Sequence, residues 1–190
     1  MISYMESSWL LSTLKPYLVN ELKVEEGTLS AVLFIIHLKN GKPYIILTKR
    51  SSKLKNHAGE ISCPGGTYSN SDKNLMQTAI RETFEEIGVR IKEQDIVGNL
   101  RPVHTRKSVF IIVPFVVIVE SISELKPCKQ EIDAVLDVPL FDLVKTASLD
   151  SEHDSFGERY RFEYNGNVVW GATARILKQI HDILHKCGMI

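Results

Sequence analysis

The chain has 190 residues, enough for one domain with a full hydrophobic core. Its 23 basic and 23 acidic side chains give a formal net charge of zero, so it lacks the positive excess that favours binding to nucleic acid or to an anionic membrane. The 3 cysteines form neither a metal-ligand spacing nor a disulfide framework, which favours a reduced, cytoplasmic protein. Residues 1–11 lack the features of a signal peptide, and the apolar stretch 109–119 is too short to cross a bilayer.

The predicted elements begin with a helix over residues 8–22, where leucines recur at helical spacing. Pro16 lies inside this helix and is expected to interrupt or kink it. Two strands follow, over residues 28–38 and 43–48. They are joined at Asn40-Gly41, which is a strong signal for a hairpin turn.

A polar loop over residues 49–71 precedes the next predicted helix. Ser71 or Asp72 can cap the start of this helix, and Gly88 is expected to end it. The elements predicted after it are strands at 96–103 and 109–119, a short helix at 139–144, a hairpin with strands at 159–164 and 168–170, and a closing amphipathic helix at 172–185.

Strands and helices are interspersed without a regular βαβ rhythm. This order predicts an α/β fold with a mixed sheet and helices packed on its faces. The sequence has no internal repeat, low-complexity tract or linker. We therefore expect a single domain over residues 1–190, with residues 1–25 as an N-terminal helical extension.

Three glutamates share one face of the predicted central helix. Glu82, Glu85 and Glu86 are spaced i, i+3 and i+4, so their carboxylates point into one sector. The neighbouring sector holds apolar residues that we expect to face the core: Leu75, Met76, Ala79, Ile80, Phe84 and Ile87. Glu82 and Glu86 are thus expected at the border between core and solvent, where desolvation adds to the repulsion between like charges.

A divalent cation is the simplest partner for this cluster. Arg81 can pair with Glu85 at i+4, but one arginine cannot balance three glutamates. A cluster made only of oxygen ligands favours hard ions, Mg²⁺ first and Mn²⁺ close behind. The alternative is a solvated acidic face, which is common in charged helices. Carboxylates near a helix C-terminus oppose the macrodipole, which weakens that alternative.

These residues carry a resemblance to a known family. Gly66, Asp72 and the run Arg81-Glu82-x-x-Glu85-Glu86-x-Gly88-Val89 resemble the Nudix box of Nudix hydrolases, here residues 66–89. The resemblance implies the Nudix α/β/α sandwich, a mixed β-sheet flanked by helices, in which the box holds metal against a diphosphate. The segment from Gly66 to Arg81 is one residue longer than usual. The glutamate usual near the start of the box is replaced here, and Asp72 is the nearest acid.

The preceding segment narrows the resemblance to coenzyme A diphosphatases. The residues that match their motif are Leu47-Thr48-Lys49-Arg50-Ser51, Lys55, Gly59 and Pro64-Gly65-Gly66. That subfamily is also similar in its longer box, with an aspartate at the position of Asp72. Lys55 stands where arginine is typical, and Cys63 stands where phenylalanine is typical.

The resemblance implies metal-dependent hydrolysis of coenzyme A or its derivatives to 3′,5′-ADP and 4′-phosphopantetheine, with Mg²⁺ or Mn²⁺ as cofactor. Glu82 and Glu86 would be the main metal ligands, and Glu85 a ligand or the general base. Arg81 would orient the glutamates, and Glu131 lies in a stretch similar to one where an acid approaches the metal. The residues expected to bind substrate are Lys49, Arg50, Ser51, Lys55, Gly65 and Gly66.

Several alternatives stay open. The basic loop, which carries Lys49, Arg50, Lys53, Lys55 and His57, can be merely solvated. Glu131 can be an ordinary surface acid. Trp170, in a Trp-Gly-x-Thr-Ala segment typical of the coenzyme A group, can stack on a base or belong to the core. Residues 104–107 can contact substrate or form a polar turn.

Two further functional hypotheses compete with coenzyme A hydrolysis. One is a Nudix hydrolase acting on ADP-ribose, NADH or a nucleoside triphosphate, because substrate choice lies in the loops of a shared fold. The other is a non-catalytic ligand-binding module, which the complete glutamate set disfavours. In each case the expected partner is a small molecule, with a homodimer left open.

Overall fold

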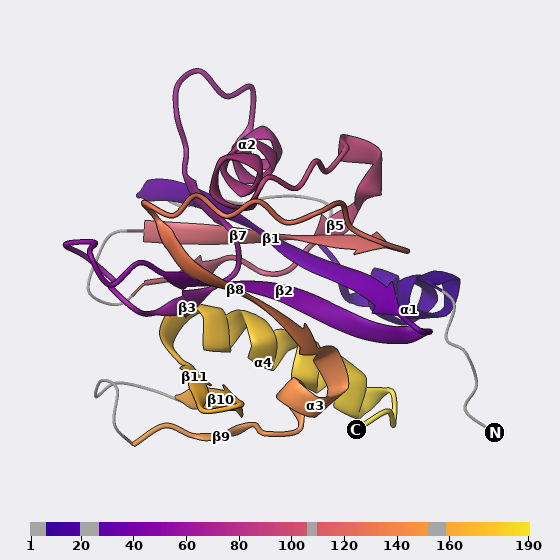
Figure 1. Cartoon of the computed structure of the whole chain (residues 1–190). Coiled ribbons are helices and arrows are strands. Elements are labelled where there is room, and N and C mark those ends of the chain that lie inside the picture. Colours follow the sequence, from indigo (N-terminus) through magenta and orange to yellow (C-terminus); the bar gives the residue numbers. More distant parts are fainter. Residues whose placement is uncertain (1–6, 20–26, 106–109, 152–158) are drawn as a thin grey trace.

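The computed structural model describes residues 7–19, 27–105, 110–151 and 159–190. A mixed β-sheet lies between helix α2 (Leu75–Ile87) on one face and helices α3 (Leu140–Val144) and α4 (Gly171–Lys186) on the other (Figure 1). Helix α1 (Ser7–Leu14) contributes Leu10 and Leu14 to the same core as α4. The predicted α/β/α sandwich is confirmed.

In the described residues the main sheet has 8 strands, with the order β3-β2-β1-β7-β5 and three strands off this path: β4 pairs with β1, β6 with β7 and β8 with β2. The pair β1–β7 is parallel and the other pairs are antiparallel. The strands are β1 (Thr28–Lys39), β2 (Lys42–Arg50), β3 (Ile61–Ser62), β4 (Gly65–Thr67), β5 (Ile96–Asn99), β6 (Val103–His104), β7 (Phe110–Val119) and β8 (Ile132–Pro139). A smaller sheet is formed by β9 (Ser148–Leu149), β10 (Tyr160–Tyr164) and β11 (Asn167–Val169).

Strand β1 is buried on both faces and separates the two halves of the core. Successive side chains of a strand point to opposite faces, so an alternating set belongs to each half. Ala31, Leu33 and Ile35 pack in the cluster under α2. Val32, Phe34 and Ile36 pack in the cluster that contains α4. This double burial explains the nearly continuous apolar sequence of β1.

Both Asn-Gly turns have the expected conformation. Asn40 and Gly41 have φ angles of 50° and 69°, and Asn165 and Gly166 have φ angles of 48° and 74°. Two consecutive left-handed residues define the turn that matches the twist of a hairpin. The two predicted hairpins are therefore confirmed, as β1–β2 and β10–β11.

Two elements are shorter than predicted. The first helix ends at Leu14 and continues as a 3₁₀ turn, Lys15–Tyr17, because Pro16 has no N–H to donate to the helix. Residues 20–22 of that prediction lie outside the described residues. The strand predicted at 96–103 is two strands, β5 and β6, separated by a segment that contains Pro102.

The sequence did not indicate three strands of the main sheet. The segment predicted as a polar loop contains β3 and β4, and β8 was not predicted as a strand. Phe84 was expected in the core, but it is 42% exposed and lies under the guanidinium of Arg90, 4.6 Å from the ring centroid. The buried face of α2 is rotated away from Phe84 and includes Thr83 and Glu86.

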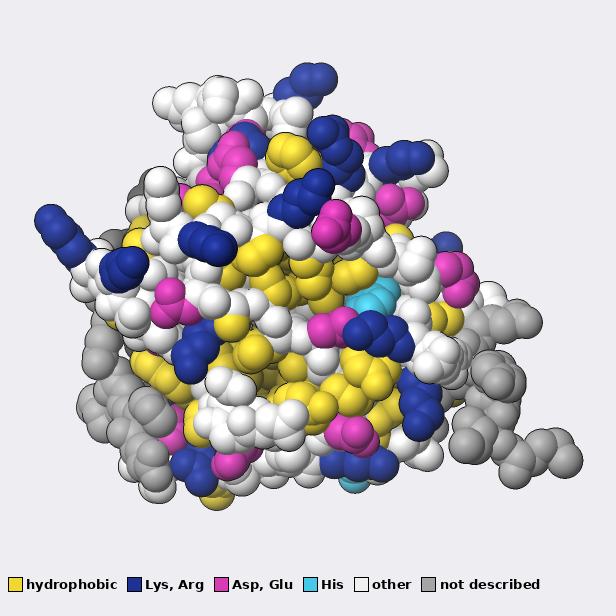
Figure 2. Space-filling view, in the orientation of Figure 1, with side chains coloured by type: hydrophobic (Ala, Val, Ile, Leu, Met, Phe, Trp, Pro, Cys, Tyr) yellow, Lys and Arg dark blue, Asp and Glu magenta, His cyan; other side chains and the backbone are white. Residues whose placement is uncertain are grey.

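Figure 2 shows the face of the molecule on which β8 lies. Hydrophobic side chains gather in the middle of this face, and basic and acidic side chains are interspersed around them. Neither sign of charge dominates the face, as the zero net charge suggests. In the described parts of the chain, no helix is long and apolar enough to cross a membrane.

Candidate active site

Two glycines of β4 bring the backbone of this strand against the carboxylate helix. β4 pairs with β1, so Gly66 lies opposite Ala31 and Gly65 opposite Val32. A Cβ atom on Gly66 would lie 2.4 Å from Oε2 of Glu82. The absence of a side chain at Gly66 therefore leaves room for the carboxylate of Glu82.

Glu86 is a buried carboxylate at this junction. The residue is 3% exposed, and its Oε2 accepts a hydrogen bond from the N–H of Gly65 at 3.0 Å. Nη1 of Arg50 lies 4.0 Å from its Oε1. Burial raises the pKa of Glu86 to about 7, while the Gly65 N–H and Arg50 lower it and the charges of Glu131 and Glu82 raise it. Ionised Glu86 is thus only partly compensated by the protein.

Arg81 binds one acid of the preceding loop and two acids of its own helix. Its Nε and Nη2 donate to the two oxygens of Asp72 at 2.8 and 2.9 Å. Its Nη1 lies 2.8 Å from Oε1 of Glu82 and 3.0 Å from Oε2 of Glu85. The predicted pair with Glu85 is confirmed, and the contacts are those of a residue that orients the glutamates.

Asp72 anchors Arg81 and does not cap the helix. Asn74 is the cap, because its side chain accepts from the N–H of Gln77 at 2.9 Å, so the predicted caps Ser71 and Asp72 were wrong. Asp72 is 6% exposed, and its carboxylate also accepts from the hydroxyl of Thr78. The hydrogen bonds from Arg81 hold the pKa of Asp72 far below its ordinary value.

We expect Asp72→Asn to lower the free energy of unfolding by about 2 kcal/mol or more, because it removes the buried charge that accepts two hydrogen bonds from Arg81. Urea denaturation of the purified variant measures the change. Asp182→Asn is the matched control, since Asp182 forms an exposed i,i+4 pair with Lys178 whose loss should cost about 0.5 kcal/mol. Equal losses in both variants would show that Asp72 is not a structural anchor.

Glu131 is held near Glu86 by backbone hydrogen bonds. The N–H of Cys128 donates to the carbonyl of Glu86 at 2.8 Å, and the N–H of Ser51 donates to the carbonyl of Glu131 at 2.7 Å. The charge of Glu131 acts on the pKa of Glu86, although Glu131 itself is exposed. Glu85 lies on the outer side, with 56% of its side chain exposed.

The donor set suits a hard divalent ion, because Glu82 and Glu86 offer oxygen ligands at a point where negative charge is under-compensated. No three His, Cys, Asp or Glu side chains of the described residues form a ready-made metal site. Arg81 contacts both Glu82 and Glu85. A metal ion at Glu86 would therefore compete with Arg81 for Glu82.

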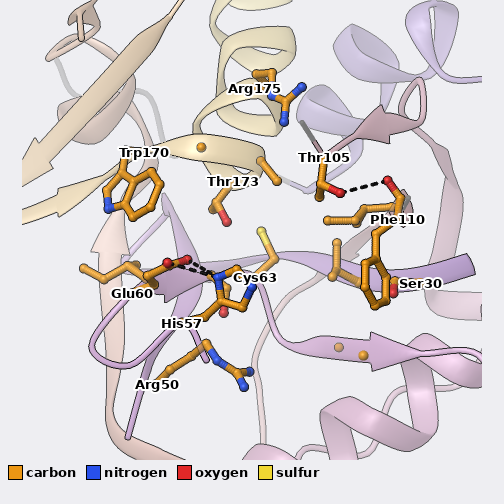
Figure 3. A pocket seen from close by; sticks show the side chains of 18 of the residues that line it. Ser30, Arg50, His57, Glu60, Cys63, Thr105, Phe110, Trp170, Thr173 and Arg175 are labelled. Carbon is orange, nitrogen blue, oxygen red and sulfur yellow. Dashed lines mark hydrogen bonds and ion pairs between the residues drawn. The ribbon is translucent and has the colours of Figure 1, made fainter. Parts of the chain in front are cut away.

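A cavity of about 650 Å³ adjoins the carboxylates through Gly65 and Gly66. Arg50 lies on one side of it, and Thr173 and Arg175 on the other (Figure 3). Its walls include β3, β4 and the start of α4. Cys63 also lines it, but burial raises the pKa of its thiol to about 12, so the sulfur is a neutral wall atom.

The structure separates the predicted substrate residues into two groups. Arg50, Gly65 and Gly66 line the cavity. Lys49 and Lys55 are not among the residues that line it, and Lys55 is exposed. The N–H of Ser51 binds the carbonyl of Glu131, so Ser51 fixes the end of β2.

The sequence did not point to some residues of the cavity, and it left the role of others open. Trp170 and Thr105 line it, in keeping with a substrate role, whereas residues 106 and 107 lie outside the described residues. Arg159 and Arg175 also line it and were not predicted. Arg175 follows the Trp-Gly-x-Thr-Ala segment by one residue and could have been noticed there, but no pattern marks Arg159.

The comparison with protein families agrees with this geometry. The model of the NUDIX domain matches residues 27–160. The chain belongs to the Nudix hydrolase family. Enzymes of this family generally use a divalent metal ion, in keeping with the carboxylates of Glu82 and Glu86.

Curated relatives cover most of the Nudix chain. It is 36% identical to "Nudix hydrolase 15, mitochondrial" of Arabidopsis thaliana over 77% of this chain and 55% of the relative. It is 34% identical to "Mitochondrial coenzyme A diphosphatase NUDT8" of Homo sapiens over 77% of this chain and 65% of the relative. It is 31% identical to "Uncharacterized Nudix hydrolase NudL" of Photorhabdus laumondii over 80% of this chain and 82% of the relative. The matches thus span from about half to four fifths of these proteins.

Solved structures share the fold at low identity. A MutT/nudix family protein from Enterococcus faecalis matches 97% of this chain and 71% of its own chain with a TM-score of 0.61 and 13% identity. The NUDIX domain of Shewanella oneidensis NrtR, solved with ADP ribose, matches 95% of this chain and 99% of its own with a TM-score of 0.59 and 14% identity. These likenesses establish the Nudix fold.

Proposed function

We propose that this Nudix hydrolase cleaves the diphosphate bond of coenzyme A or its derivatives, giving 3′,5′-ADP and 4′-phosphopantetheine. The human relative named as a coenzyme A diphosphatase supports the substrate. The longer box, with Asp72 as its acid, is the sequence feature that agrees with it. The observation that carries the proposal is Glu86, buried between the N–H of Gly65 and Arg50 at the edge of the cavity.

In this proposal the carboxylates of Glu82 and Glu86 hold Mg²⁺ or Mn²⁺, with Glu85 as a further ligand or the general base. A divalent ion bound there neutralises charge on the diphosphate and lowers the pKa of a water molecule. Arg81 keeps Glu82 and Glu85 oriented. Glu131 is a second candidate for the base, because it lies within electrostatic reach of Glu86.

Arg50 is the side chain best placed to bind the reacting diphosphate. It lines the cavity, its Nη1 is 4.0 Å from Glu86, and its Nε is buried without a hydrogen-bond partner among the described residues. A buried donor of this kind is costly unless a ligand satisfies it. Guanidinium groups also match the geometry of phosphate oxygens.

The test is a panel of diphosphates incubated with the protein and Mg²⁺ or Mn²⁺, with the products identified by mass. Coenzyme A should yield 3′,5′-ADP and 4′-phosphopantetheine faster than ADP-ribose, NADH or a nucleoside triphosphate is cleaved. Preferred cleavage of one of those compounds would replace coenzyme A by another Nudix substrate. Binding without hydrolysis in either metal would instead indicate a ligand-binding module.

We expect Arg50→Gln to lower kcat/KM for coenzyme A by about 100-fold, which corresponds to the loss of a charge-assisted contact of about 3 kcal/mol. Steady-state kinetics with saturating metal ion measure this change. Lys53→Gln is the matched control, because Lys53 is exposed on the same loop and is not among the residues that line the cavity. A similar loss in both variants would point to a diffuse electrostatic effect and not to a contact by Arg50.

Three expectations stay predictions. They are the single domain over residues 1–190, the homodimer and the cytoplasmic location. The relatives compared above include proteins named as mitochondrial, so the location of this chain needs its own measurement.

A further inference from the structure

The N-terminal turn of α4 forms the side of the cavity away from Arg50. Gly171, Ala172, Thr173 and Arg175 all line the cavity. In Figure 3, Arg50 lies at the bottom of the view, and Thr173 and Arg175 lie toward the top. The cavity is thus bounded by two basic regions, and only the one at Arg50 adjoins the carboxylate helix.

This helix end presents donors that the described residues do not use. The first backbone hydrogen bond of α4 is made by Ala174, whose N–H donates to the carbonyl of Trp170. The N–H groups of Gly171, Ala172 and Thr173 have no acceptor in the described parts of the chain, and Trp170 provides no side-chain cap. Free N–H groups and the positive end of the helix dipole together favour an anion.

Thr173 gives an independent sign of a ligand. The residue is 7% exposed, and its side chain points into the cavity (Figure 3). Its hydroxyl has no hydrogen-bond partner within residues 7–19, 27–105, 110–151 and 159–190. Thr173 lines the cavity, and its hydroxyl oxygen is not one of the fully buried, unpaired polar atoms of the described residues, so it can be reached by a ligand in the cavity.

The charges around the cavity favour a second anionic group. Arg159 and Arg175 line it in addition to Arg50. Two acids line it as well: Asp150, which is buried, and Glu60, which is paired with His57 at 3.0 Å. The three arginines and the helix end outweigh these two acids.

We propose that the N-terminal turn of α4, with the hydroxyl of Thr173 and the charges of Arg159 and Arg175, binds the 3′-phosphate of a coenzyme A-type substrate. This inference rests on the proposed function, which places the diphosphate at Arg50 and Glu86. A substrate that fills both ends of the cavity must carry a phosphate remote from its diphosphate, and coenzyme A does. Selection for that phosphate is thereby assigned to α4 and not to Lys49 and Lys55.

The test compares coenzyme A with dephospho-coenzyme A, which lacks only the 3′-phosphate. Thr173→Val should lower kcat/KM about tenfold more for coenzyme A than for dephospho-coenzyme A, since one hydrogen bond to a charged group is lost. Thr173→Ser keeps the hydroxyl and should keep the preference for coenzyme A over dephospho-coenzyme A. If Thr173 acted only through the packing of its methyl group, the serine variant would lose that preference. Thr173→Ala repeats the test if the valine variant does not fold.

Lys55→Gln tests the alternative that Lys55 binds the 3′-phosphate. It should leave the ratio of kcat/KM for coenzyme A to kcat/KM for dephospho-coenzyme A within twofold of that of the unaltered protein. A ratio that falls with Lys55→Gln and not with Thr173→Val would overturn the inference. So would an unaltered protein that cleaves both compounds equally well. Either result leaves hydrolysis of coenzyme A intact, so the proposed function would survive.

Binding by calorimetry separates the inference from catalysis. The unaltered protein should bind 3′,5′-ADP about tenfold more tightly than 5′-AMP, and Thr173→Val should abolish that difference. If coenzyme A is not hydrolysed at all, the proposed function fails. The calorimetric comparison then decides by itself whether α4 binds a 3′-phosphate. Equal affinities for the two nucleotides would then refute it.

Discussion

Glu86→Gln is expected to lower kcat for diphosphate hydrolysis by about 1000-fold or more while the protein becomes more stable without metal ion. The activity falls because an amide carries no charge for a cation. The stability rises because burial, helped by the charges of Glu131 and Glu82, raises the pKa of Glu86 to about 7. The amide oxygen can still accept the hydrogen bond from Gly65.

The pH dependence of this stability has a definite sign. The folded protein keeps a proton on Glu86 up to a pH of about 7, whereas the unfolded chain loses it near the ordinary glutamate pKa of 4.5. Between these values the folded state binds more protons, so stability falls as pH rises. The fall amounts to about 3 kcal/mol in the metal-free protein.

Thermal denaturation from pH 4.5 to pH 8 in a chelating agent measures this effect. The fall in stability with rising pH should be absent in Glu86→Gln. It should be unchanged in Glu163→Gln, a control at an exposed glutamate. Mg²⁺ or Mn²⁺ should raise the Tm of the unaltered protein at pH 8 and not that of Glu86→Gln. Turnover within tenfold of normal in Glu86→Gln would remove Glu86 from the proposed metal site.

Gly65→Ala is expected to lower the free energy of unfolding by about 3 kcal/mol or more. Gly65 has a φ angle of 143°, which residues with a side chain rarely adopt. An added Cβ would lie 2.3 Å from the carbonyl oxygen of Ala31 and 2.5 Å from Cα of Val32, both backbone atoms. The β4–β1 pair must therefore move, and the N–H of Gly65 leaves Glu86.

Gly59→Ala separates the clash from the backbone conformation. Gly59 also has a positive φ angle, 72°, but an added Cβ would have no atom within 4 Å. We expect this control to cost only about 1 kcal/mol. Urea denaturation and hydrolysis assays on both variants provide the comparison. A cost at Gly65 equal to that at Gly59 would show that the strand pair accommodates a side chain.

Local patterns predicted the parts of the fold that local chemistry determines. The Asn-Gly turns, the helix stop at Gly88 and the closing helix follow from backbone preferences of a few residues. β3 and β4 have two and three residues, too few to show an alternating pattern, and exist only because they pair with β2 and β1. No local signal could have revealed them.

In the candidate site, too, local patterns predicted some features, and others depend on the folded chain. The spacing of Glu82, Glu85 and Glu86 could be predicted, but not which of them is buried. Glu86 is buried because the helix turns Thr83 and Glu86 inward and Phe84 outward. A hydrophobicity pattern predicts the opposite, since it places the aromatic side chain in the core. The cavity combines β3, β4 and α4, and its distant arginines come together only in the folded chain.

The contact between Asp72 and Arg81 also bears on how such boxes can evolve. An aspartate is one methylene shorter than a glutamate, and the loop that carries Asp72 has one extra residue. The turn in which Ser69 accepts from the N–H of Asp72 uses that length and delivers the acid to Arg81. The contact in this chain therefore depends on both the length of the loop and the short side chain of Asp72. A search that fixes the spacing would overlook this box, whereas one that asks for a buried acid against the arginine would find it.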